Sequence, residues 1–121
     1  MINPYTKLEI FQDSLSAFYI THAFSLKLPK HELYELGSQV RRSADAINSN
    51  IVEGYGRRRY KNDYIKFLIY SHSSNDETIN HLRKIVVLYP DLKDEGDSLI
   101  EYYQIIGAKL NKFIAYIENN K

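Results

Sequence analysis

Hydrophobic residues recur every three or four positions along four stretches of the 121-residue chain, at about residues 7–28, 30–53, 58–88 and 97–118. This spacing is that of one face of an α-helix. In the first stretch the repeating positions are Leu8, Phe11, Leu15, Phe18 and His22. In the second they are Leu33, Leu36, Val40, Ala44, Ile47 and Ile51. In the fourth they are Leu99, Tyr102 or Tyr103, Ile106, Leu110, Phe113 and Ile117. No alternation typical of a strand competes, so we predict four amphipathic helices.

Proline and glycine separate the four stretches. Pro29 precedes the second stretch, where its fixed φ suits the start of a helix. Gly54 follows Glu53 and is expected to end that helix in the left-handed conformation, and Asp97 is expected to cap the fourth helix. Short connections place consecutive helices antiparallel. The prediction is therefore a single domain over residues 1–121, all-α, with the architecture of an antiparallel up-down four-helix bundle.

The third stretch keeps the helical period but is polar in its middle, over residues 71–77. Two interpretations stay open: a closely packed, hydrogen-bonded contact between helices, or a surface facing solvent or the central channel of an oligomer. Gly107 is either a tolerated glycine or a point where a neighbouring helix comes close. An excess of tyrosine favours self-association, with packing on the surface of a monomer as the alternative. The tyrosines in question are Tyr64, Tyr70, Tyr102, Tyr103 and Tyr116.

Candidate catalytic chemistry is sparse. The chain has no cysteine, which excludes disulfides, thiolate catalysis and cysteine-based metal sites. Glu77 and His81, like His72 and Asp76, are four residues apart, a spacing that favours hydrogen bonds within one helix over a metal site. We expect no enzyme activity, no catalytic residues, no metal and no cofactor. The N-terminus shows no targeting pattern, and no apolar run reaches the roughly 20 residues of a membrane span, so we expect a cytoplasmic protein without membrane contact.

Charge is unevenly distributed although the formal net charge is only +1. Residues 38–66 carry seven basic and three acidic side chains, and five of the six arginines lie there. The basic residues are Arg41, Arg42, Arg57, Arg58, Arg59, Lys61 and Lys66. Arginine binds phosphate through a planar, bidentate fork, so this segment predicts binding of an RNA or DNA backbone without base-specific readout.

The arrangement of these basic residues refines that prediction. On a helix, Arg41 and Arg42 form a patch separate from residues 57–61 on one subunit, and an oligomer would merge the two. Tyr55 and Tyr60 interleave with the second patch and are candidates for stacking on bases. In the alternative interpretation the arginines pair with acidic residues of a neighbour, for which Glu53, Glu77 and the acidic run 91–97 are candidates.

Several segments match a recognisable pattern. They are Gln39-Val40-Arg41-Arg42-Ser43-Ala44, then Asn50-Ile51-Val52-Glu53-Gly54-Tyr55-Gly56-Arg57, then Tyr64-Ile65-Lys66-Phe67-Leu68, then Ser74 and Glu77. Together they resemble the small four-helix bundle proteins encoded in rRNA intervening sequences. Ala46, Asn48 and Ser73 depart from the serine, proline and glycine usual there. We interpret Gln39, Asn50, Glu53, Gly54 and Glu77 as structural residues of the motif, with Glu53 bonding backbone or an arginine.

The resemblance implies a bundle that assembles with itself into a closed ring, a pentamer. It also implies kinship with the accessory proteins of diversity-generating retroelements, which are thought to bind nucleic acid and a reverse transcriptase. No catalytic residues are known for the family. We therefore expect a non-enzymatic homo-oligomer that binds RNA or DNA backbone through arginine clusters, as an accessory factor. The alternative is a protein–protein interaction adaptor whose arginines form structural salt bridges in the oligomer.

Overall fold

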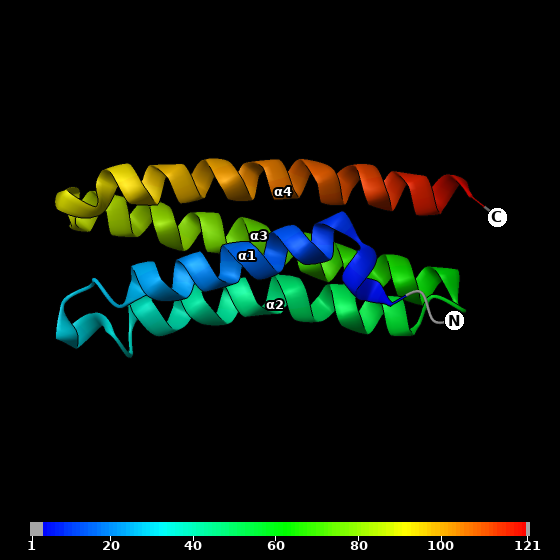
Figure 1. Cartoon of the computed structure of the whole chain (residues 1–121), viewed down its shortest axis with the longest axis horizontal. Helices are drawn as coiled ribbons and strands as arrows, with labels where there is room; N and C mark the ends of the chain where they lie inside the picture. Colours follow the sequence, from blue (N-terminus) through cyan, green and yellow to red (C-terminus); the bar gives the residue numbers. More distant parts are fainter. Residues whose placement is uncertain (1–3, 121) are drawn as a thin grey trace.

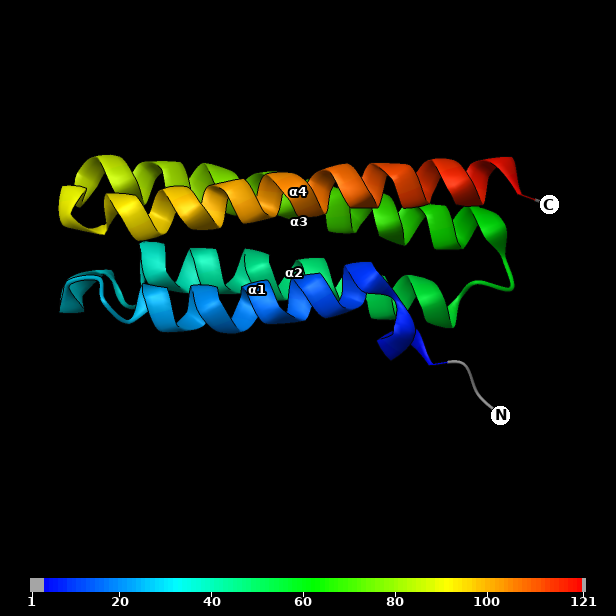
Figure 2. The same ribbon diagram turned by 45° about the horizontal axis from the view of Figure 1, so that its top comes forward.

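The computed structural model describes residues 4–120, and Figures 1 and 2 show its α-helices running alternately in opposite directions. The α-helices are α1 (Glu9–Ser25), α2 (Leu36–Gly56), α3 (Lys61–Leu88) and α4 (Lys93–Asn119), and three short 3₁₀ turns are η1 (Tyr5–Lys7), η2 (Lys30–Glu32) and η3 (Pro90–Leu92). The predicted all-α antiparallel bundle is confirmed. Residues 1–3 and 121 of the expected domain, including the start of the N-terminal segment searched for a targeting signal, lie outside the described residues.

The helices form a closed cycle of neighbours. Helix α2 packs against α1 and α3, and α4 packs against α3 and α1, which leaves α1 and α3 on opposite corners. The central core contains side chains from α2, α3 and α4 that water does not reach. They are Val40, Ala44, Ile47, Ile51, Leu68, Leu82, Ile85, Tyr103, Ile106 and Leu110. The hydrophobic stripes predicted for the second and fourth stretches therefore face the core.

The stripe predicted for the first helix is displaced from the fully buried face, although Leu8, Phe11 and Phe18 are half-buried and pack against the core. The buried face of α1 is formed by Ile10, Ser14, Ala17, Thr21 and Phe24, whereas His22 is exposed. Small and hydroxylated side chains allow α1 to lie close to its neighbours, and Thr21 Oγ1 lies 2.6 Å from the hydroxyl of buried Tyr103. Hydrophobic spacing alone could not reveal this, because the buried face is partly polar.

Several predicted helix boundaries also need correction. Helix α1 is shorter than expected, and α3 begins at Lys61 rather than near residue 58. Helix α2 begins at Leu36 rather than near residue 30, because the chain after Pro29 first forms the η2 turn. Helix α4 begins at Lys93, so Asp97 lies inside its first turns and pairs with Lys93 instead of capping it.

The predicted left-handed glycine cap of α2 is wrong as well. The helix continues through Gly54 to Gly56, and no residue among 4–120 has a positive φ. Gly54 is buried, and an added methyl group there would lie 3.1 Å from Cβ of Phe67 and 3.3 Å from the Tyr64 ring. Close packing of α3, rather than backbone freedom, explains the glycine.

The polar middle of α3 forms hydrogen bonds to the other helices. Ser71 Oγ donates to the Ile47 carbonyl at 2.7 Å, and Thr78 Oγ1 donates to Ser43 Oγ at 2.8 Å, both towards α2. Asn75 Nδ2 donates to the Tyr103 carbonyl of α4 at 2.8 Å. A methyl group at Gly107 would lie 3.0 Å from that same nitrogen, which confirms a close helix approach. Of the two interpretations of residues 71–77, the closely packed, hydrogen-bonded contact between helices is therefore the one seen within a single chain.

Candidate nucleic-acid interface

The turn between α2 and α3 presents basic side chains at one end of the bundle, the end at which α2 is followed by α3 in Figure 2. Residues 57–60 connect Gly56 to Lys61 and are all exposed. The backbone of the turn is internally bonded, because the Arg57 and Tyr60 amides donate to the Gly54 and Arg57 carbonyls at 2.9 Å each. Internal hydrogen bonds therefore fix the backbone that carries these exposed side chains.

Arg57 is held by acidic neighbours. Its Nε donates to Glu53 at 2.8 Å, its Nη1 lies 3.6 Å from Asp63, and its guanidinium lies 4.8 Å from the centre of the Phe67 ring. The hydrogen bond that Arg57 donates to Glu53 is the main reason that the pKa of Arg57 is raised above its ordinary value. The role predicted for Glu53, bonding an arginine at the turn, is confirmed. Arg57 fastens the end of α2 to the start of α3.

The remaining basic residues of the turn surround a hollow of about 400 Å³. Arg58, Arg59 and Lys61 line it together with Tyr64, Ile117 and Asn120. We call the exposed residues Arg58, Arg59, Tyr60 and Lys61 the basic end. Within residues 4–120 no carboxylate side chain forms an ion pair with Arg58, Arg59 or Lys61.

Local contacts position the basic end. The Arg58 guanidinium lies 4.1 Å from the centre of the Tyr55 ring and donates to the Tyr55 carbonyl at 2.9 Å. Lys61 Nζ donates to the carbonyls of Glu118 and Asn120 at 2.9 and 2.7 Å, so its charge lies at the C-terminal end of α4, where a cation is favoured. Burial raises the pKa of Tyr64 beneath the hollow to about 12, so this phenol stays neutral at physiological pH.

The other predicted binding residues lie elsewhere. Lys66 is exposed further along α3, with Nζ 5.6 Å from the centre of the Phe67 ring. Arg41 is half-buried, and its two terminal nitrogens donate to Ser25 Oγ at 2.9 Å and to the Leu33 carbonyl at 2.7 Å. Arg42 is exposed beside a separate hollow of about 400 Å³ between α2 and α3.

The hollow beside Arg42 collects several motif residues. Gln39 and Glu77 line it with Arg42. The structure thus brings together motif residues of α2 and α3 that are far apart in the sequence. Asn50 instead donates to the Ala46 carbonyl of its own helix at 2.9 Å. Glu77 also lies 3.4 Å from Nε2 of His81, and His72 Nδ1 lies 3.6 Å from Asp76, both within α3. Within the part of the chain that the structure describes, no three potential ligand side chains gather to hold a metal ion.

Sequence reasoning missed the α4 side of the basic end. Ile117 and Asn120 line the hollow, and the carbonyls at the end of α4 hold Lys61. These residues are far from the α2–α3 turn along the chain, and an apolar side chain and backbone carbonyls carry no local signal of a site. Only the antiparallel packing of α4 on α3 places them there.

Fold and surface together define a small helical-bundle protein with a concentration of cations at one end. Residues 6–112 match the model of the family described as 23S rRNA-intervening sequence protein. Because this match covers most of the chain, the protein belongs to that family. A comparison with curated proteins found no match. None of the helices among residues 4–120 combines the length and apolarity needed to cross a membrane.

Proposed function

We propose that this protein is a non-enzymatic, homo-oligomeric bundle that binds the phosphate backbone of RNA or DNA through its basic end. The observation that carries the proposal is the hollow lined by Arg58, Arg59 and Lys61, whose cations have no carboxylate partner within residues 4–120. Guanidinium and ammonium groups bind phosphate oxygens by charge-assisted hydrogen bonds. Such contacts position a nucleic acid without reading its sequence.

Self-assembly strengthens binding in this proposal. One basic end offers few phosphate contacts. Each phosphate that a cation neutralises adds to the binding affinity through the release of counterions. An oligomer places several basic ends on one particle, so a nucleic acid that spans them gains by effective concentration. The cytoplasm is the proposed site of action, and a reverse transcriptase is a proposed partner that rests on the family resemblance alone.

The test is a salt titration of binding to a generic single-stranded RNA, followed by fluorescence anisotropy. We expect the logarithm of the affinity to fall linearly with the logarithm of salt concentration, with a slope of about −0.7 per phosphate contact. The double variant Arg58→Ala/Arg59→Ala should bind at least tenfold more weakly and show a shallower slope. Lys30→Ala, which removes an exposed cation in the η2 turn, is the matched control and should bind like the wild type.

Two results would contradict the proposal. Unchanged RNA affinity in Arg58→Ala/Arg59→Ala would mean that the basic end is not the binding surface. Dissociation of the same variant into monomers would favour the protein–protein adaptor, in which arginines form structural salt bridges in the oligomer. The pairing of Arg57 with Glu53 and Asp63 supports this adaptor, because it shows an arginine of the turn engaged in salt bridges.

A further inference from the structure

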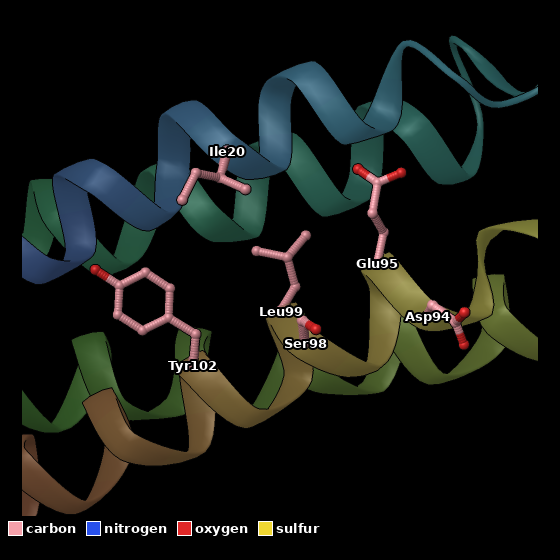
Figure 3. Close-up of a pocket in the computed structure, with 6 residues that line it drawn as sticks. All are labelled: Ile20, Asp94, Glu95, Ser98, Leu99 and Tyr102. Atoms are coloured by element: carbon pink, nitrogen blue, oxygen red, sulfur yellow. The ribbon is translucent and has the colours of Figure 1, made fainter.

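An apolar groove with an acidic edge lies between α1 and α4, near the start of α4. It has a volume of about 390 Å³ and is lined by Ile20, Asp94, Glu95, Ser98, Leu99 and Tyr102. Figure 3 shows Ile20 on α1 opposite Leu99 and Tyr102 on α4, with the two carboxylates at one end of the row. Glu95 is paired with Lys27 at 2.6 Å, whereas Asp94 forms no ion pair within residues 4–120. We call this surface the α1–α4 groove.

A second surface, at the end of α3, has the opposite charge. Arg83, Lys84, Val87 and Leu88 lie together there, three and four residues apart on one face of the helix. Val87 is 76% exposed and Leu88 is 58% exposed, although both are large aliphatic side chains. Among the described residues, neither Arg83 nor Lys84 forms an ion pair. We call this surface the α3 end face.

The two surfaces complement each other but cannot meet within one chain. Helix α1 does not contact α3, and the groove is lined by α1 and α4 whereas the end face belongs to α3 alone. Both lie near the same end, because α3 finishes at Leu88 and α4 starts at Lys93. Neighbouring copies would therefore meet at the same level along the bundle axis.

We propose that the α3 end face of one copy of this chain docks into the α1–α4 groove of the next. Val87 and Leu88 enter the apolar groove, and Arg83 and Lys84 face Asp94 and Glu95 across its rim. Exposed apolar surface rimmed by charge is typical of protein interfaces, and opposite charges fix the register in which the copies meet.

The contact is heterologous, because each copy uses one surface to bind and the other to be bound. Heterologous contacts generate rings when the rotation between copies closes, and filaments when it does not. This inference rests on the self-association in the proposed function and specifies which residues produce it. It does not depend on nucleic-acid binding.

A mixing experiment tests the pairing. Val87→Glu places a carboxylate on the end face, opposite Asp94 and Glu95, and leaves the groove intact. Ile20→Lys places an ammonium group in the groove, opposite Arg83 and Lys84, and leaves the end face intact. By light scattering coupled to gel filtration, each variant should be monomeric at concentrations where the wild type is assembled. Their equimolar mixture should assemble, because the intact end face of Ile20→Lys meets the intact groove of Val87→Glu.

The controls separate this inference from simpler explanations. Ile69→Glu changes another half-exposed aliphatic residue of α3 and should leave the assembly intact. Circular dichroism should show unchanged helix content for all three variants. If a charged variant unfolds, Val87→Ser and Ile20→Ser replace the pair, with the same expectations.

The outcomes are distinguishable. A wild type that is monomeric would overturn both this inference and the self-association in the proposed function. A wild type that assembles, together with variants that also assemble, would overturn this inference alone. Dissociation by only one of the two variants, or a mixture that stays monomeric, would show that the end face and the groove are not partners.

Discussion

Arg41 and Arg42 are adjacent in the chain but belong to different parts of the molecule. Arg41 joins the end of α1 to the η2–α2 connection through Ser25 Oγ and the Leu33 carbonyl. Arg42 is exposed beside a separate hollow between α2 and α3. The helix period places Arg42 outward and Arg41 on the flank, but the spacing of residues does not show that the Arg41 guanidinium has hydrogen-bond partners inside the fold.

We predict that Arg41→Ala lowers the free energy of unfolding by about 2 kcal/mol, since hydrogen bonds from a charged group to partly buried partners are lost. Arg42→Ala should change it by no more than about 0.5 kcal/mol, as is usual for an exposed side chain. Urea denaturation of both variants measures the difference. Equal changes would show that the bonds of Arg41 to Ser25 and Leu33 do not stabilise the connection.

Tyr60 is the exposed aromatic ring of the basic end, with 64% of its surface accessible between Arg59 and Lys61. If the basic end binds nucleic acid, Tyr60→Ala should weaken binding to single-stranded RNA by about 1–3 kcal/mol, the usual contribution of one stacked base. Binding to duplex RNA, whose bases are already stacked, should change little. Tyr34→Ala removes a ring that is 86% exposed in another part of the chain and is the matched control.

Competition anisotropy with both RNA forms measures these effects. Equal losses for single-stranded and duplex RNA would indicate that Tyr60 contributes to the backbone contact or to the shape of the turn, and not to stacking. Tyr60→Phe keeps the ring and should retain single-strand binding.

At the scale of the helix, the sequence predicts α2 and α4 far better than α1. In α2 and α4 the buried positions are mostly aliphatic, so periodicity alone identifies their core faces. In α1 the buried face includes Ser14, Ala17 and Thr21, while Tyr19 and Ile20 are exposed. The register of α1 is set by helix approach and by the bond between Thr21 and Tyr103, which become visible only in three dimensions.

The candidate site divides in the same way. The clustering of Arg57, Arg58, Arg59 and Lys61 is plain in the sequence, but the helix period places residues 58–61 at the start of the third helix, whereas in the structure residues 57–60 form the turn. What the sequence does not reveal is that Arg57 is neutralised by Glu53 and Asp63 while the others are free of carboxylates among the described residues. That distinction depends on side-chain geometry around a single turn.

Helices α3 and α4 meet closely at Gly96, near the η3 connection. An added methyl group there would collide with the Val86 side chain and would lie 3.4 Å from the Phe24 ring. Val86 is β-branched and cannot easily rotate away. We predict that Gly96→Ala lowers the free energy of unfolding by about 1–3 kcal/mol, the usual range for an overpacked core.

A second substitution tests the cause. Val86→Ala removes the atoms that collide, so Gly96→Ala/Val86→Ala should be more stable than Gly96→Ala alone. Gly56→Ala is the control, because nothing lies within 4 Å of a methyl group at that position. There the better helix propensity of alanine should leave stability equal or slightly higher. Thermal and urea unfolding of the wild type, the two single variants and the double variant give a double-mutant cycle, with Gly56→Ala measured beside them. Additive effects of Gly96→Ala and Val86→Ala on the free energy of unfolding would exclude a direct collision.

At the scale of the whole molecule, the formal net charge is only +1, yet the surface has three separate charged regions. The basic end lies beside the C-terminus of α4, and the acidic rim of the α1–α4 groove lies near the start of α4. The α3 end face supplies cations close to that start. Self-association through the groove and the end face uses opposite charges in pairs, so it leaves the cations of the basic end available to a polyanion. The two proposed interactions therefore do not compete for the same residues.

Buried tyrosines make the stability of the bundle depend on alkaline pH. Burial raises the pKa of Tyr64 from 10.0 to about 12, and burial also raises the pKa of Tyr103. An unfolded chain loses these protons near pH 10, whereas the folded chain keeps them to higher pH. The contribution of Tyr64 to the free energy of unfolding is thus fully present below pH 10 and is lost as the pH rises from 10 to about 12. In that pH range the unfolded state binds fewer protons than the folded state.

We predict that the free energy of unfolding falls between pH 10 and 12 and that Tyr64→Phe makes this fall shallower, since phenylalanine cannot ionise. At pH 7 the same variant should unfold at nearly the wild-type urea concentration. Tyr116→Phe removes a hydroxyl from a ring that is 59% exposed and is the matched control, whose pH profile should follow that of the wild type. Urea titrations at intervals of half a pH unit give the profiles. If Tyr64→Phe and Tyr116→Phe have the same slope, the burial of the Tyr64 phenol does not oppose its ionisation, and the hollow above it must admit enough water to solvate a phenolate.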